Sequence, residues 1–331
     1  MNNDSVTVWN HSEPLKIRAG DERTSFEDSD DRRKTYGGCM GGEDIFRFGD
    51  TNREIGFHRL TSEALKILSS EQVELFNSVG YLTGLPGLGP DEIIELRHYL
   101  DWLINEVISA DDRRNSYSIN QYHQVCGPLW DLIHTPIFVG YVTDVLGPEA
   151  VCWSTHMFCK LPGDNMEVPL HQDANYWPFT PTKSVTIWLA IDDANQENAA
   201  MRFVPGSHLV GDLEHVELPL DGSVVLNRRV AAHDTYDTLV SNELQAGDVS
   251  LHSDLLLHGS PANSSNRRRC GIALRYIAAS VRTVTGAESW THSAVHVESG
   301  DPSGYWPNRP RPAVDEPHKM ARFLGGFDGN T

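Results

Sequence analysis

The 331-residue chain has no run of eighteen apolar residues, and its first residues do not place an apolar stretch behind a basic one. We therefore expect neither a membrane-spanning helix nor a secretory signal, and we expect a cytoplasmic protein. The cysteines are few and odd in number: five, at positions 39, 126, 152, 159 and 270, with no Cys-x-x-Cys spacing. This pattern argues against a disulfide framework or a zinc ribbon and favours free thiols.

Positive charge is also scarce, because 27 Lys and Arg stand against 46 Asp and Glu, for a formal net charge of −19. So acidic a chain disfavours sequence-independent binding to nucleic acid or to anionic membranes, and the three adjacent arginines at 267–269 are a thin case for either. The sequence lacks dinucleotide-binding and Walker glycine loops and a G-x-S-x-G nucleophile elbow. The charge says little about small-molecule substrates, and monomer and homo-oligomer both stay open.

The order of patterns along the chain predicts a mainly β fold with a helical N-terminal front. Residues 1–60 are expected to form a flexible or loosely packed extension, since they are rich in Asp, Gly and Arg with few spaced apolar residues, although they could instead wrap the domain or contact another subunit. Residues 61–331 are expected to form one domain. Helical signals occupy 61–80, 89–112 and 128–147, short β-branched and aromatic runs follow from about 150, and 286–331 reads as an irregular tail.

Four pairs in the sequence place one residue between a histidine and an acid: His171/Asp173, His215/Glu217, His252/Asp254 and His296/Glu298. A mononuclear iron(II) oxygenase holds its metal with two histidines and one carboxylate and keeps the opposite face open. An H-x-D pair at a strand end can supply two of these ligands from one side of the strand. The third must come from a distant strand, so context decides among the pairs.

His171 and Asp173 have a suitable partner in His258, which follows an apolar run 87 residues after His171. Ser260 lies just beyond it, and Arg269 follows eleven residues after His258, where a guanidinium can hold a carboxylate through two parallel hydrogen bonds. Alternation along a strand would turn the preceding arginine, at 268, to the opposite face.

The other three pairs are weaker candidates. His252/Asp254 is expected within the same strand as His258, where it cannot supply a distant ligand. His215/Glu217 lies in a loop rich in Leu, Pro and Asp, and His296/Glu298 lies in the expected irregular tail, so both are expected to be solvated.

Together these motifs resemble the phytanoyl-CoA dioxygenase family of iron(II)- and 2-oxoglutarate-dependent oxygenases, over roughly residues 68–282. The resemblance rests on "PLHQD" (169–173), "TIWLAIDDANQENAAMRFVPGSH" (186–208), "AGD" (246–248), "LHGSPAN" (257–263), Arg269 and the helical front. It implies a double-stranded β-helix, that is, a cupin-like jelly roll. The residues to which it assigns roles are His171, Asp173 and His258 as iron ligands, Arg269 and Ser260 as contacts of the 2-oxoglutarate carboxylate, Trp188 beside the cosubstrate, and His208 as a structural or pocket-lining residue.

The activity that the resemblance implies is hydroxylation of an unactivated carbon in a small molecule or specialised metabolite, with 2-oxoglutarate and O2 consumed and succinate and CO2 released. Desaturation, cyclisation and halogenation on the same scaffold stay open, as does a non-catalytic jelly-roll binding module. Asp173 argues against halogenation, since halogenating relatives carry a small residue there so that chloride can bind iron.

Four residues are candidates for the substrate pocket. His156 and Lys160 share one face of an expected strand, where either could meet an anionic group or face solvent, and Tyr176 and Trp177 offer aromatic walls.

Overall fold

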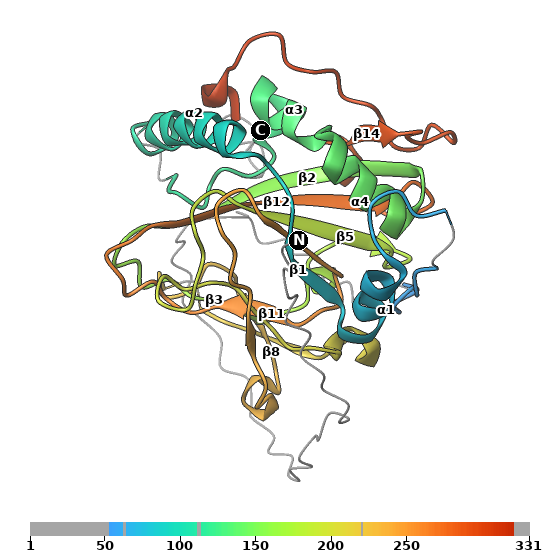
Figure 1. The fold of residues 1–331 in the computed structure, drawn as a ribbon, viewed down its shortest axis with the longest axis horizontal. Coiled ribbons are helices and arrows are strands. Elements are labelled where there is room, and N and C mark those ends of the chain that lie inside the picture. The colour runs from blue at the N-terminus through green and yellow to red at the C-terminus, as the bar shows by residue number, and fades with distance from the viewer. Residues whose placement is uncertain (1–52, 62–63, 111–113, 220, 321–331) are drawn as a thin grey trace, which may run out of the picture.

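The computed structural model describes residues 53–61, 64–110, 114–219 and 221–320 (Figure 1). Most of the expected extension, residues 1–52, lies outside the described residues. Its last part is held against the core, because Arg53 donates hydrogen bonds to the carbonyls of Phe179 and Ala174, each at 3.0 Å, and the amide of Gly56 donates to the Thr182 hydroxyl at 3.0 Å. This contact reaches the residue that directly follows Asp173.

The predicted helical front is present with shifted boundaries. Its helices are α1 (Ser70–Val79), α2 (Pro90–Ile108), α3 (Gly127–Ile133) and α4 (Pro136–Leu146), with 3-10 turns at Tyr122–Gln124, Asp173–Asn175, Ser207–Val210, His233–Thr235, Glu288–Thr291 and Pro317–Lys319. Helix α1 begins later than the helical signals suggested, because Ser69 forms the capping box with Gln72. The third predicted helical segment is two helices, since Pro136 disfavours helical conformation in the residue before it.

The strands form two main antiparallel sheets, which confirms the predicted mainly β, jelly-roll class. The larger sheet has the order β1-β10-β5-β12-β2-β14, the smaller has β3-β11-β6-β9, and β4 with β13 and β7 with β8 form two-stranded ribbons. The bounds are β1 Tyr81–Leu85, β2 Glu149–Lys160, β3 Val168–His171, β4 Phe179–Thr180, β5 Ser184–Ala190, β6 Arg202–Phe203, β7 His215–Glu217, β8 Arg228–Val230, β9 Val240–Ser241, β10 Val249–His252, β11 His258–Ser260, β12 Arg269–Ala278, β13 Arg282–Thr283 and β14 Val295–Glu298.

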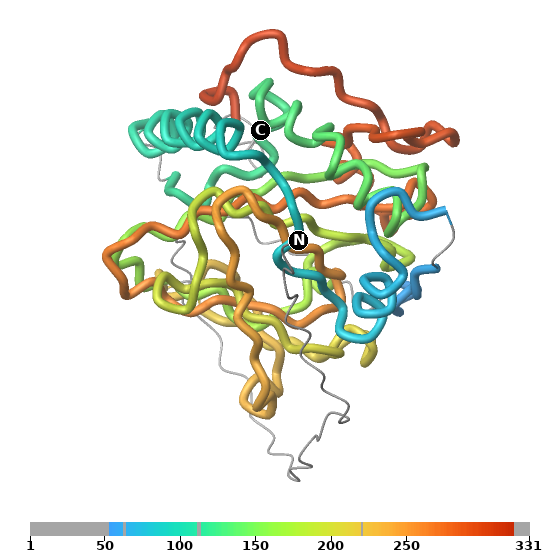
Figure 2. The backbone as a smooth tube through the Cα atoms, viewed as in Figure 1, coloured from blue at the N-terminus to red at the C-terminus, as the bar shows by residue number. Residues whose placement is uncertain are grey.

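Strand β12 lies at the middle of the larger sheet, between β5 and β2, and is buried along its whole length. Figure 1 shows α2, α3 and α4 on one side of this sheet and β3 and β11 on the other, and the backbone trace of Figure 2 follows the same layers. The hydroxyl of Tyr276 donates to the Ile133 carbonyl on the helix side, whereas Arg269 reaches Ser260 of β11 on the other side. The alternation of β12 therefore divides helix-facing from site-facing side chains.

The predicted irregular tail is wrong in one part. Residues Val295–Glu298 form β14, which pairs antiparallel with β2 at the edge of the larger sheet. Four residues are too short a run for periodicity to reveal. Among the described residues, no helix is both long and apolar enough to cross a membrane, and Cys126, Cys152, Cys159 and Cys270 are free and buried.

Candidate metal centre and cosubstrate site

His171, Asp173 and His258 come together between the two main sheets. Their possible ligand atoms all lie within 4.8 Å of one another, and all three side chains are buried. His171 ends β3 and is directly opposite His258 of β11 in the antiparallel register, with ring centroids 4.2 Å apart. Nε2 of His171 lies 3.6 Å from Oδ1 of Asp173. The trio is therefore formed by strand pairing and by the turn that follows β3.

Both histidines are oriented by backbone hydrogen bonds. Nδ1–H of His171 donates to the Pro169 carbonyl at 2.8 Å, and Nδ1–H of His258 donates to the Leu256 carbonyl at 2.9 Å. A hydrogen bond at Nδ1 fixes the tautomer in which Nε2 keeps its lone pair. The two rings thus present neutral Nε2 atoms, the form that binds a metal ion.

The turn between the two ligands is anchored by Gln172, which the sequence reasoning missed. Its side-chain amide donates to the carbonyls of Gly211 (2.8 Å) and Leu255 (2.7 Å), and its side-chain oxygen accepts from the amide of Leu213 at 2.9 Å. Asp173 then opens a 3-10 turn instead of continuing the strand. Sequence alone carried no signal for this role, because the burial and hydrogen bonding of a glutamine follow from the fold.

Electrostatics favour the ligand forms of these groups. Burial alone would raise the pKa of Asp173, but the adjoining His171 and the positive charge of Arg275 hold it well below its usual range. Burial, together with the neighbouring His171, lowers the pKa of His258 well below its usual value. A carboxylate beside neutral imidazoles is the donor set that suits a divalent metal.

His252 belongs beside this centre, contrary to the expectation that it shares a strand with His258. Residues 249–260 form β10 and β11 in different sheets, and the turn between them brings Nε2 of His252 to 3.9 Å from Oδ2 of Asp173. Its ring centroid lies 4.7 Å from that of His258. The run "SLHSDLLLHGS" did not reveal the turn, because all its residues are buried and three consecutive leucines continue the strand-like pattern.

In the two remaining pairs Glu217 and Glu298 are exposed as expected, whereas His215 and His296 are only partly exposed. Nε2 of His215 accepts a hydrogen bond from the backbone N–H of Gln172 at 3.1 Å, so it braces the same ligand turn. Nε2–H of His296 donates to the Trp306 carbonyl at 2.7 Å. His208 is buried and bonded through Nε2 to the Asn77 carbonyl at 3.2 Å, in keeping with a structural role.

The residues expected at the cosubstrate site also adjoin one another. Nη2 of Arg269 donates to Oγ of Ser260 at 3.1 Å, and its guanidinium carbon lies 5.7 Å from the Trp188 ring centroid. Arg269 is buried, and its Nε has no hydrogen-bond partner among the described residues. Gly271 makes room for the indole, since a Cβ there would meet Cζ2 of Trp188 at 2.0 Å. A buried guanidinium with unused donors is prepared for a carboxylate.

The neighbouring arginines differ in this respect. Arg268 is bonded to Asp192 at 2.7 and 3.0 Å and to Asp101, and the exposed Arg267 pairs with Glu197 at 2.7 Å. Of the three adjacent arginines, Arg269 alone points to the metal centre's side of the sheet.

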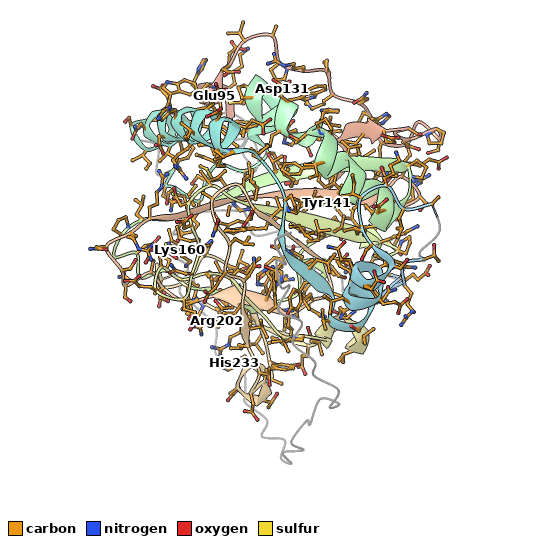
Figure 3. All side chains as sticks on the ribbon, in the orientation of Figure 1. Glu95, Asp131, Tyr141, Lys160, Arg202 and His233 are labelled. Atoms are coloured by element: carbon orange, nitrogen blue, oxygen red, sulfur yellow. The ribbon has the colours of Figure 1, made fainter. Side chains whose placement is uncertain are left out.

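The predicted pocket residues divide into two groups. Nε2–H of His156 donates to the Tyr117 carbonyl at 2.9 Å, and the ammonium group of Lys160 (Figure 3) donates to the Met166 carbonyl, so neither faces solvent. Burial and the nearby Arg269 lower the pKa of Lys160 to about 7. The aromatic pair adjoins the metal centre through the chain itself, because Tyr176 and Trp177 follow the Asp173 turn.

Tyr176 packs its ring edge-on to that of His171 with centroids 5.6 Å apart, and its hydroxyl donates to the Arg228 carbonyl at 3.0 Å. Trp177 packs edge-on against Trp153 with centroids 5.0 Å apart.

Fold and site together define a jelly-roll protein with a two-histidine, one-carboxylate cluster that could hold a metal ion. The family model for phytanoyl-CoA dioxygenase (PhyH) matches residues 98–271, just over half of the chain. The chain belongs to this family, which confirms the resemblance seen in its motifs.

Individual relatives are more distant. The peroxisomal phytanoyl-CoA dioxygenase of Bos taurus is 29% identical over 147 residues, covering 43% of this chain and 43% of that protein, so the match spans less than half of the relative. Among solved structures, the non-heme monooxygenase ThoJ aligns with a TM-score of 0.63 at 23% identity, covering 76% of this chain and 92% of that one. CytC3 with Fe(II) and alpha-ketoglutarate aligns with a TM-score of 0.53 at 20% identity, covering 76% and 94%. These two likenesses support the fold.

Proposed function

We propose that this chain is an Fe(II)- and 2-oxoglutarate-dependent dioxygenase that hydroxylates an unactivated carbon of a small molecule. The observation that carries the proposal is the buried trio with ligand atoms within 4.8 Å, whose two imidazoles both keep Nε2 free. The donor set fits iron(II), which two imidazoles and one carboxylate bind at one face. Family membership and the prepared Arg269 support 2-oxoglutarate as the cosubstrate.

Each residue has a distinct task in this reaction. His171, Asp173 and His258 would hold the iron, and Arg269, oriented by Ser260, would bind the far carboxylate of 2-oxoglutarate. When bound, iron and cosubstrate supply the oxidation chemistry, in which O2 is consumed, 2-oxoglutarate becomes succinate and CO2, and the substrate carbon gains oxygen. The protein excludes water from the space between the sheets and fixes the ligand directions.

Hydroxylation is favoured over halogenation because Asp173 is present and lies 3.6 Å from His171. Incubation of the iron-loaded protein with its substrate and bromide, followed by mass spectrometry, tests this point. A brominated major product would contradict it.

The test of the proposed function separates binding from turnover. Under anaerobic conditions, iron(II) and 2-oxoglutarate should produce the visible charge-transfer band of the chelated metal. Under air, a screen of candidate substrates should release succinate in proportion to product. His171→Ala should abolish both signals. Absence of the band in the unaltered, folded protein would instead favour a non-catalytic jelly-roll module.

A further inference from the structure

Strand β12 carries a second buried arginine on the same side as Arg269. The site-facing residues of this strand are Arg269, Gly271, Ala273 and Arg275, and they alternate with the helix-facing ones. Arg275 lies opposite Thr186 of β5 and Ser154 of β2. Arg275 follows Arg269 by six positions, a Cα spacing of about 20 Å along an extended strand. Arg275 is thus at the other end of the same interior face.

Arg275 adjoins the candidate metal centre. Its guanidinium carbon lies 5.3 Å from the ring centroid of Trp177, which follows Asp173 by four residues. The charges of Arg275 and Asp173 act on one another, and both act on the buried His156. The side chain therefore lies on the interior face that also carries the candidate metal ligands.

The guanidinium of Arg275 is buried, and its donors lack polar partners among the described residues. The side chain is 9% exposed, its Nε is buried without a hydrogen bond, and no described residue forms a hydrogen bond or ion pair with it. Asp173, the acid whose charge acts on it most, is a candidate metal ligand. An unpaired buried charge is costly, so a protein retains one where a ligand supplies the missing partner.

Aromatic rings surround the group in place of polar residues. The ring centroids of Trp153 and Phe158 each lie 6.0 Å from the guanidinium carbon, and Trp177 is closer. Cation–π contacts of this kind hold a guanidinium in place without using its hydrogen-bond donors. Arg269 shows the same combination of an aromatic face and an unpartnered Nε, and there the proposed cosubstrate supplies the anion.

Charge balance indicates what the second anion would be. In the loaded site, the charges of iron(II) and Arg269 together match those of Asp173 and doubly charged 2-oxoglutarate. Arg275 adds one further positive charge beside them. A single negative charge on the substrate would neutralise it, and a carboxylate also matches the two-pronged guanidinium.

We propose that Arg275 is a substrate-binding residue that holds a carboxylate of the substrate, with the apolar part of that molecule against Trp153, Trp177 and Phe158. This inference rests on the proposed function, since it places the substrate next to the metal centre. It narrows the substrate class to small carboxylic acids with an apolar or aromatic body.

The experiment is a binding measurement without turnover. The full chain, loaded anaerobically with iron(II) and 2-oxoglutarate, is titrated calorimetrically with phenylacetate and with its neutral analogue phenylacetamide. Phenylacetate should bind at least about thirty-fold more tightly, and Arg275→Met should remove that preference. Arg267→Met is the matched control, because Arg267 is exposed and paired with Glu197, and it should leave the preference unchanged.

Further arms keep the result decisive. Arg275→Lys keeps the positive charge but loses the two-pronged hydrogen-bond geometry, so its preference for phenylacetate should be reduced about tenfold. This variant also provides a test if Arg275→Met does not fold. Equal affinity of the unaltered protein for both probes, or an intact preference in Arg275→Met, would overturn the proposal. If benzylphosphonate bound more tightly than phenylacetate, and did so only with Arg275 present, the group held by Arg275 would be a phosphonate and the carboxylate assignment would be wrong. Failure of the unaltered protein to bind iron(II) or 2-oxoglutarate would instead contradict the proposed function.

Discussion

Replacing Arg269 by alanine removes the guanidinium that we expect to bind the far carboxylate of 2-oxoglutarate. In the structure this group is buried, contacts Ser260 at 3.1 Å and leaves Nε free, so the cosubstrate would receive charge-assisted hydrogen bonds in a dry environment. Truncating one partner of such a pair costs roughly 2–5 kcal/mol. Because 1.4 kcal/mol corresponds to a tenfold change, affinity should fall by about thirty-fold or more.

The assay is anaerobic titration of the iron-loaded protein with 2-oxoglutarate, followed through the charge-transfer band. Ser260→Ala gives the internal scale, since it removes one hydrogen bond worth about 1 kcal/mol and should weaken binding by less than about tenfold. Arg267→Ala is the control, because its partner Glu197 lies on the exposed side. If Arg269→Ala bound 2-oxoglutarate as tightly as Arg267→Ala, the cosubstrate would have to bind elsewhere.

Three further perturbations have defined outcomes. His258→Ala should abolish stoichiometric iron binding, measured as iron content after reconstitution, whereas His233→Ala, in a turn away from the centre, should keep it; retained iron in both would refute the ligand assignment. Removing residues 1–52 should leave iron affinity unchanged, whereas removing 1–56 should weaken it, because the longer cut deletes the hydrogen bond to the ligand turn; equal affinities would show that this bond does not matter. Burial lowers the pKa of His123 from 6.5 to about 4. Between pH 6.5 and pH 4 the unfolded chain therefore binds a proton at this residue and the folded chain does not, so the free energy of unfolding falls as the pH drops. His123→Gln should reduce this acid loss, measured by urea unfolding from pH 7 to pH 4, by on the order of 3 kcal/mol; an unchanged pH slope would contradict the assignment.

The proximity of His171, Asp173 and His258 could be predicted from the sequence because an H-x-D pair at a strand end and a later histidine after an apolar run fit one facial metal site. His171 and His258 must face each other across β3 and β11, and the H-x-D spacing survives even though Asp173 lies in a 3-10 turn. The resemblance to a known family added the cosubstrate contacts. The helical front was likewise readable, because Pro90 and the apolar spacing after it mark α2 clearly.

What the sequence concealed depends on long-range packing. His252 was predicted within the strand of His258. The turn between β10 and β11 is fully buried, and only Ser253 and Asp254 in it are polar. Arg275 was unremarkable within an apolar strand, and its lack of partners becomes visible only when the surrounding rings are placed. Burial of a charge is a property of the fold, and local pattern does not report it.

The close approach of Gly271 to Trp188 restricts how this site can change over time. Any side chain at 271 would overlap the indole, since even a Cβ would come within 2.0 Å of it. The indole in turn forms the aromatic face under Arg269. The two positions therefore cannot be substituted independently. A larger residue at 271 is tolerated only after Trp188 has been replaced by a smaller residue, and a protein with that replacement alone lacks the aromatic face under the Arg269 guanidinium. Directed evolution of this scaffold should accordingly find substitutions at the two positions together or not at all.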